Sequence, residues 1–361
     1  MAEPVPSSMR TLPSAPERRG YFDLLRGLAL LRVVVYHTVA VWWLHVVFPA
    51  IGVMFALAGS LMAASMRRRS ALRVVGSRLR RLLPPVWLYA AVALICGWEV
   101  LGPGGHDWSR LLFWVVPLRD PHETSGGSGF VDTLWYLRTY LWFVLLTPPL
   151  LWAFRKASAI VLATPLAMLP IAVFFVGHGT GRGLGISTLS YGTCWMLGFA
   201  EHDGVLRRIS FWVCGLVALI VGGAGMAVLL GFPIADPKNA GLDEVGYALW
   251  SAAVVLVLMR WRPDTSWLRR VPGLDRMVTV VNARAVTIYL WHDAAIVATG
   301  AIVGLVGLHL TPTAKLPMVF ALVAVAVLLA GWMEDLAARR RPSLLPGRRP
   351  SRAGPQPAVR A

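Results

Sequence analysis

Charged residues are scarce in this chain. Only 15% of its 361 residues are Asp, Glu, Lys or Arg, against about 25% in soluble domains, while 57% are hydrophobic. This composition excludes an ordinary soluble globular domain and a disordered chain. It predicts an all-α, polytopic membrane protein, in which the helices that face lipid carry few charges.

Cysteines and acidic residues are also few. The three cysteines form no CxxC pair and no metal-binding spacing, which excludes a disulfide framework and a cysteine-based metal site. The 18 acidic residues stand against 35 basic ones, for a net charge of +17. In a soluble protein this excess would indicate nucleic-acid binding. Here the placement of the basic residues explains it better, and we expect no nucleic-acid partner.

Long apolar runs predict about ten membrane spans, since a helix needs about 20 mainly apolar residues to cross a bilayer. The short stretch 108–118 is expected to lie at the interface as a half-buried helix. We predict a disordered cytoplasmic tail at 1–20, a membrane domain at 21–336 and a basic, Pro-rich cytoplasmic tail at 337–361. The ten predicted spans are 22–44, 46–66, 82–101, 132–154, 157–177, 186–200, 211–231, 244–260, 280–308 and 316–335.

The basic residues predict the orientation of these spans. With the N-terminus inside and ten alternating spans, 26 of the 35 Lys and Arg residues fall in inside segments, five fall outside and four lie within spans. This is the positive-inside pattern of membrane proteins. It predicts a multi-pass protein of the cell membrane with both termini in the cytoplasm, whose arginines also contact anionic lipid head groups.

Ionisable residues within a span usually face a cavity or a partner. Arg26 and His37 are eleven residues apart in the first span, so they lie on one stripe of a helix and roughly 16 Å apart along its axis. Asp23 is three residues before Arg26 and can pair with it. The alternative is that Arg26 extends to the membrane surface and that His37 is a packed core residue.

Two further ionisable residues are expected at a similar depth. From the helix rise, His292 lies roughly 18 Å into the ninth span and His37 roughly 22 Å into the first. Arg138 lies roughly 9 Å below the outer surface in the fourth span. We therefore expect the three side chains to converge near one level of the membrane, and at least one of His292 and Arg138 to line the same cavity as His37. Alternatively, His292 is a structural residue beside Trp291, and Arg138 pairs with Asp132.

The residue types indicate the chemistry. A buried neutral histidine is the usual general base for a hydroxyl group, and arginine binds phosphate or carboxylate. The chain contains no Gly-x-Ser-x-Gly and no HExxH, so we expect neither a hydrolase triad nor a metal site. The residues alone fit group transfer and, nearly as well, proton-coupled transport.

Several segments, in this order, resemble the acyltransferase 3 family of integral membrane proteins. The most specific is Phe22-Asp-Leu-Leu-Arg-Gly-Leu-Ala29 followed by His37, which matches the family's Arg-x10-His pattern. The chain departs from the family pattern at Ala58, where Ser is common, and before Tyr289, where Ser-x-Pro is frequent; both departures concern the substrate class. The other similar segments are Arg80–Trp87, Leu134–Leu141 and Ile288–His292.

The resemblance implies about ten spans and transfer of an acyl group, often acetyl, from acyl-CoA to a hydroxyl of a carbohydrate, glycolipid or small metabolite. Acyl-CoA is then a co-substrate, and no bound cofactor is expected. The carried-over catalytic residues are His37, as general base, and Arg26. We assign substrate binding to Asp23, Arg138, Tyr289 and His292, and donor binding to Arg80 and Arg81. The alternatives are a secondary transporter or lipid flippase, and an inactive membrane scaffold.

Overall fold

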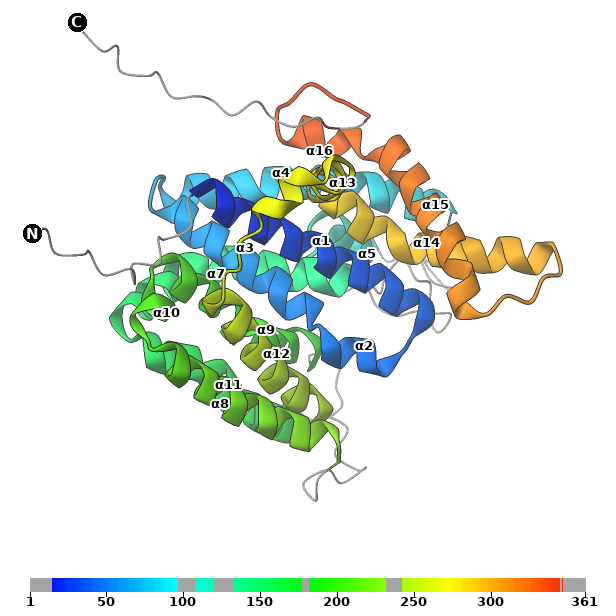
Figure 1. Cartoon of the computed structure of the whole chain (residues 1–361). Coiled ribbons are helices and arrows are strands. Elements are labelled where there is room, and N and C mark those ends of the chain that lie inside the picture. The colour runs from blue at the N-terminus through cyan, green and yellow to red at the C-terminus, as the bar shows by residue number, and fades with distance from the viewer. Residues whose placement is uncertain are drawn as a thin grey trace, which may run out of the picture.

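The computed structural model describes residues 15–96, 108–119, 133–176, 182–231, 242–344 and 346. Throughout this described part the regular structure is helical and contains no strand, which confirms the predicted all-α class. Figure 1 shows the long helices packed into one bundle, with α1 (Ala15–Val39) running through its middle. The predicted tails at 1–20 and 337–361 fall largely outside the described residues.

The described helices follow one another along the chain in this order. The N-terminal half contains α2 (Trp42–Val47), α3 (Ala50–Met66), α4 (Ala71–Cys96), α5 (Trp108–Val115), α7 (Leu134–Lys156) and α8 (Ser158–Val176). The C-terminal half contains α9 (Arg182–His202), α10 (Val205–Arg208), α11 (Phe211–Leu229), α12 (Leu242–Arg260), the 3-10 turn η2 (Ser266–Arg270), α13 (Pro272–Ala283), α14 (Ala285–Leu305), α15 (Pro312–Ala330) and α16 (Trp332–Ala337).

Each predicted span falls on a helix, and the short segment 108–118 contains α5. Within the described ranges, six helical segments are long and apolar enough to cross a membrane: 42–66, 134–156, 158–175, 211–229, 285–305 and 312–330. The other four predicted spans fall on the more polar helices α1, α4, α9 and α12. The total of ten spans and the cytoplasmic position of both termini therefore remain predictions.

At three places a predicted span runs clearly past the end of a helix, each time because the helix breaks at a specific residue. The first helix ends at Val39 rather than at 44, because Ala40 adopts a left-handed conformation with φ 55°. The ninth starts at Ala285 rather than at 280, because buried Arg284 leaves the helix at φ −115°. The tenth ends at Ala330 rather than at 335, because the chain turns at Gly331 and continues as α16.

Helices α3 and α9 form the tightest crossing near the site. A Cβ atom added at Gly59 would lie 2.1 Å from the carbonyl oxygen of Trp195, and one at Gly198 would lie 2.1 Å from that of Ala56. Only glycine permits so close an approach of two helix backbones, the usual way in which membrane helices associate. The fully buried rings of Phe55, Phe143 and Trp195 fill the adjacent core.

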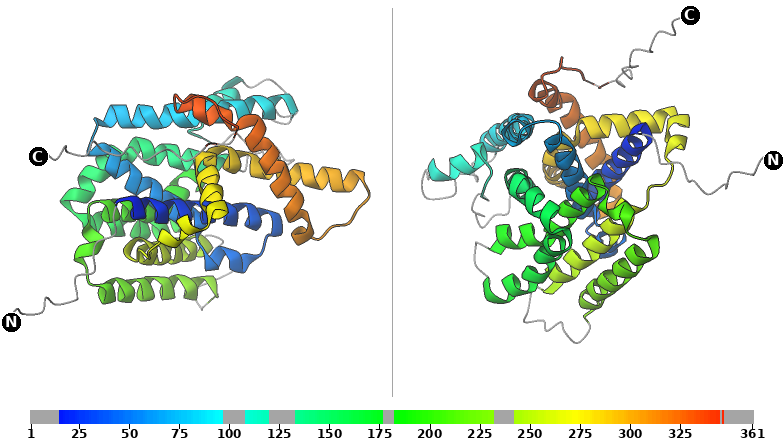
Figure 2. Two further views of the ribbon diagram at one scale, coloured as in Figure 1. Left: turned by 45° about the horizontal axis from the view of Figure 1, so that its top comes forward. Right: turned by 90° about the vertical axis from the view of Figure 1, so that its left-hand side faces the viewer.

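Helix α1 is positioned by neighbours from both ends of the chain. It packs against α3 and also against α13, α14 and α15. In Figure 2 (left) the yellow α13 crosses the direction of the other helices, and the α14–α15 hairpin projects from one end of the bundle. This arrangement places the C-terminal half of α1 beside α14, the two helices that carry the predicted histidines.

Candidate active site

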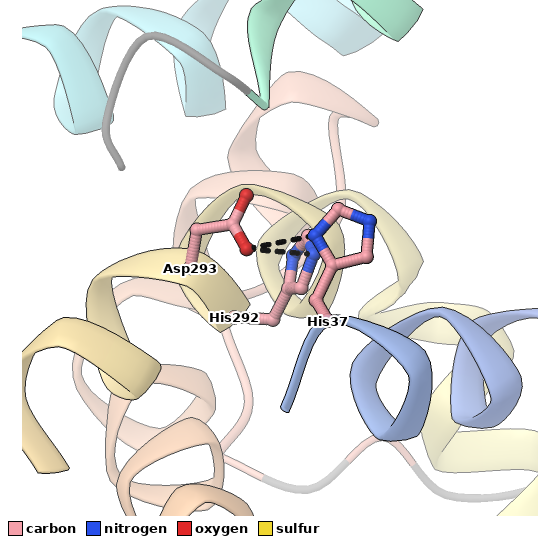
Figure 3. Close-up of side chains that lie close together, drawn as sticks. All are labelled: His37, His292 and Asp293. Atoms are coloured by element: carbon pink, nitrogen blue, oxygen red, sulfur yellow. Dashed lines mark hydrogen bonds and ion pairs between the residues drawn. The ribbon is translucent and has the colours of Figure 1, made fainter. Parts of the chain in front are cut away.

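His37 forms a hydrogen bond with an acidic residue of α14. Its Nδ1 atom lies 3.0 Å from Oδ1 of Asp293, and Figure 3 shows the two side chains meeting from α1 and α14. An ionised carboxylate only accepts hydrogen bonds, so Nδ1 of His37 carries the hydrogen and Nε2 of the neutral ring keeps its lone pair. The side chain of His37 is 36% exposed and that of Asp293 only 10%.

A threonine and a tyrosine fix the position of Asp293. The hydroxyl of Thr133 donates to Oδ2 of Asp293 at 2.8 Å, so both carboxylate oxygens are bound. The hydroxyl of Tyr289 in turn donates to the backbone carbonyl of Thr133 at 3.0 Å. These contacts join the start of α7 to α14 and hold the carboxylate toward His37.

His292 lies directly behind this pair. Its ring centroid is 4.9 Å from that of His37, in an edge-on arrangement, and its side chain is only 1% exposed. The Nδ1 atom of His292 donates to the carbonyl oxygen of Tyr289 at 2.6 Å, since a carbonyl can only accept. Its Nε2 atom lies 3.3 Å from Oδ1 of Asp293. The expected convergence of the two histidines is therefore present.

Arg26 lies on the same helix as His37, nearer the α13 end of the bundle. It is 3.6 Å from Oδ1 of Asp23, the pairing expected from their spacing. It also donates to Oδ1 of Asn282 on α13 at 3.2 Å, and Asn282 donates to the carbonyl oxygen of Asp23 at 2.7 Å. These bonds hold the guanidinium at the junction of α1 and α13.

Arg138 is buried, with 4% exposure, but its described hydrogen bond goes to α9 rather than to His37. Its Nη2 atom donates to the hydroxyl of Ser187 at 3.4 Å, and Thr139 shares that hydroxyl at 3.1 Å. The alternative partner Asp132 lies outside the described residues. Of the two residues predicted at the depth of His37, the structure thus brings His292 beside it, and it places Arg138 where α7 packs on α9.

A cavity of about 410 Å³ opens between α1, α4, α7, α14 and the C-terminal segment. Arg26 lines it together with Tyr289, which was predicted to bind substrate. Neither His37 nor His292 lines this cavity, but Tyr289 contacts the ring of His292 at a centroid distance of 5.5 Å and so connects the cavity to the histidine pair. The other charged residues of its lining are Arg78, Arg81, Glu334, Asp335 and Arg340.

A second cavity, of about 600 Å³, adjoins the first and is strongly basic. Arg78 and Arg81 line both cavities, whereas Arg80, also predicted to bind the donor, lines neither. Residues three apart on a helix share a face, and Arg80 is turned about 100° from Arg81. Six arginines face the second cavity: Arg68, Arg69, Arg78, Arg81, Arg207 and Arg262.

The carboxylate of Glu334 holds the start of α14. It accepts hydrogen bonds from the backbone N–H of Thr287 at 2.8 Å and from its hydroxyl at 2.7 Å. Burial raises the pKa of Glu334 to about 7, against the lowering effect of the bonds from Thr287. Beside it, Arg284 donates to Oδ2 of Asp335 at 2.7 Å. The α16 segment therefore anchors the helix that carries His292 and Asp293.

Asp293 and Thr133 were not among the predicted site residues. The available signal for Asp293 was an acidic residue next to His292 in an otherwise apolar span, a costly placement that usually marks a functional site. The ligand atoms of His37, His292 and Asp293 lie within 4.8 Å of one another, so the three side chains could also hold a metal ion. The hydrogen bond between His37 and Asp293 satisfies both groups without one.

One of three comparisons with known proteins gives a match. The family model Acyl_transf_3, described as an acyltransferase domain, matches residues 19–334, which include both histidines and Asp293. No curated protein and no solved structure gave a match.

Proposed function

The chain belongs to the acyltransferase 3 family, and from this premise we propose that it transfers an acyl group from acyl-CoA to a hydroxyl group. We propose acetyl as the acyl group. The acceptor is a carbohydrate, a glycolipid or a small metabolite. Family membership supports acyltransferase activity in general, and six apolar helices support a multi-pass membrane protein. We place it in the cell membrane.

The observation that carries the proposal is the bond between His37 and Asp293. Because Nδ1 of His37 donates to the carboxylate, Nε2 is the basic atom, and the partly exposed ring can reach an acceptor. In the proposed reaction Nε2 takes the hydroxyl proton while the oxygen attacks the thioester carbonyl. The tetrahedral intermediate then expels the CoA thiolate, which receives the proton from His37. Asp293 stabilises the imidazolium formed in between.

The basic cavities support an acyl-CoA donor. CoA carries several phosphate charges, which arginine side chains bind with charge-assisted hydrogen bonds. We propose that the phosphates lie among Arg78, Arg81 and the other arginines of the larger cavity, and that the acyl chain passes Arg26 and Tyr289 toward His37. The donor then enters from the face that the charge pattern assigns to the cytoplasm.

An assay with the full chain in proteoliposomes tests this function. Labelled acetyl-CoA is supplied with a panel of sugars and glycolipids, and the acylated product is identified by mass spectrometry. We expect His37→Ala to insert normally but to lower turnover by about 10²–10⁴-fold, the usual contribution of a general base. His309→Ala, at an exposed position between α14 and α15, serves as the matched control. Turnover by His37→Ala close to that of the unchanged chain would reject the mechanism, and a transporter or flippase would release no CoA.

A further inference from the structure

Arg32 lies in the middle of α1, on a different side of the helix from Arg26 and His37. It is six residues after Arg26 and therefore turned about 240° around the axis. Its exposure is only 7%, although it lies within the first predicted span. A guanidinium at such a position is costly unless a partner compensates its charge.

The structure provides only part of that compensation. Nε of Arg32 donates to the carbonyl oxygen of Leu44 at 3.2 Å, and the guanidinium carbon lies 4.7 Å from the centroid of the Tyr36 ring. The Nη2 atom is buried and has no hydrogen-bond partner. Among the described residues no carboxylate forms an ion pair with Arg32. A buried guanidinium with one unbound nitrogen matches an anionic group supplied by a ligand.

The Tyr36 ring that contacts this cation belongs to a row of aromatic rings that also reaches His37. The ring of His45 lies 5.1 Å from that of Tyr36 and 4.4 Å from that of Tyr247 on α12. Tyr36 is 5.7 Å from His37, measured between ring centroids. The rings of Tyr36, His45 and Tyr247 are only partly buried, and Nδ1 of His45 has no hydrogen-bond partner. Partly exposed aromatic rings with a few unbound polar atoms are typical of small-molecule sites.

We propose that Arg32 binds an acidic group of the acyl acceptor, and that the acceptor is a saccharide bearing a carboxylate or a phosphate. This inference rests on the proposed acyl transfer, which makes His37 the reacting base. The anion would bind Nη2 of Arg32, and the sugar would lie on the rings of Tyr36, His45 and Tyr247, with one hydroxyl reaching His37.

The donor is a poor candidate for this position. Arg32 lines neither of the two arginine-rich cavities. Its contacts are made with Leu44 of α2 and Tyr36 of α1, about 9 Å further along the helix than Arg26. The two cations thus lie on different sides of α1, which leaves the side of Arg26 to the donor and the side of Arg32 to the acceptor.

Binding measurements without a donor test the site. The full chain in lipid nanodiscs is titrated with glucuronate, glucose 6-phosphate and glucose, and binding is followed by the shift in Tm. We expect saturable stabilisation by at least one of the two anions and little by glucose; the anion that binds identifies the acidic group. Arg32→Gln should weaken that binding about tenfold or more, the loss expected for a charge-assisted hydrogen bond, while Arg67→Gln, in the exposed α3–α4 connection, should not.

Two outcomes would overturn the proposal: stabilisation by neither anion, or equal affinity in Arg32→Gln and the unchanged chain. Stabilisation of Arg32→Gln by acetyl-CoA shows that this variant is folded. If Arg32→Gln does not insert into the membrane, Arg32→Lys takes its place, because lysine keeps the charge but lacks the planar guanidinium. Acetyl-CoA is then added to the bound anion. Binding through Arg32 without acyl transfer would leave the anion site standing and reject the proposed function.

Discussion

His37 and Asp293 are 256 residues apart in the chain, yet Nδ1 of the histidine lies 3.0 Å from Oδ1 of the aspartate. The contact depends on the packing of α1 against α14. It determines which nitrogen of His37 is basic, because the carboxylate binds the one that carries hydrogen. Replacing the carboxylate should therefore affect proton transfer more than binding.

We predict that Asp293→Asn lowers kcat strongly and leaves KM for both substrates nearly unchanged. The amide can donate to Nδ1 of His37, which stabilises the tautomer with hydrogen on Nε2 and removes the base. Thr133→Ala leaves the carboxylate in place and should cost less. Steady-state kinetics of the two variants are the measurement. A rise in KM with unchanged kcat would show that Asp293 binds substrate instead.

Removing metal ions with a chelator distinguishes two roles for His37, His292 and Asp293: a hydrogen-bonded catalytic group or a metal site. If the hydrogen-bonded pair is the catalytic device, we expect prolonged dialysis against a chelator to leave turnover unchanged, and added Zn²⁺ not to raise it. Metal analysis of the purified chain accompanies the assay. Loss of turnover on dialysis, with recovery on adding a metal, would instead make these three side chains ligands.

The sequence allowed more to be predicted along each helix than between helices. The helix rise alone predicted His37 and His292 at similar depth, and their rings are 4.9 Å apart. The Arg26–Asp23 pair followed from spacing in the same way. Asp293 was missed because its contact with His37 depends on how α14 is rotated against α1, which tertiary packing decides.

The arginines predicted to bind the donor show the same limit. The basic run before the third span predicted phosphate binding, but it could not distinguish Arg80 from Arg78, because the helix face that meets the cavity depends on the neighbours of α4. Likewise, nothing local predicted that the first helix ends at Val39, where Ala40 takes a positive φ.

We predict that Arg81→Ala raises KM for acyl-CoA about tenfold or more, because a charge-assisted hydrogen bond to phosphate is worth about 1.5–3 kcal/mol. Arg80→Ala is the matched control, since Arg80 is adjacent on α4 and lines neither cavity. The KM for acyl-CoA is measured at saturating acceptor. Equal effects of the two substitutions would indicate that the basic segment only orients the protein in the membrane.

Cysteine labelling tests the predicted topology. With ten spans and cytoplasmic termini, position 238 lies outside and position 350 inside. A single cysteine is introduced at each position in a cysteine-free chain, and intact cells are treated with a membrane-impermeant thiol reagent. We expect labelling at 238 only, with labelling at 350 after the cells are opened. The reverse pattern would reject both the orientation and the assignment of the donor face.

The buried carboxylate of Glu334 predicts a dependence of stability on pH. Burial raises its pKa from the ordinary value of 4.5 to about 7, so between these pH values the folded chain keeps a proton that the unfolded chain has lost. The contribution of Glu334 to the free energy of unfolding therefore falls as pH rises from about 4.5 to 7. It is constant below and above this interval. Glu334→Gln keeps an oxygen that can accept the bonds from Thr287 but does not titrate.

The difference in Tm between Glu334→Gln and the unchanged chain should thus be small near pH 4 and should grow, in favour of glutamine, up to about pH 7. Thermal unfolding in nanodiscs at a series of pH values measures it. Glu334→Ala removes the acceptor oxygens as well and should be less stable than the glutamine variant at every pH. Parallel pH curves for Glu334→Gln and the unchanged chain would show that the carboxylate has an ordinary pKa. The bonds from Thr287 and the positive end of α14 would then offset the cost of burying the anion, so that Glu334 ionises in the folded chain over the same pH range as in the unfolded one.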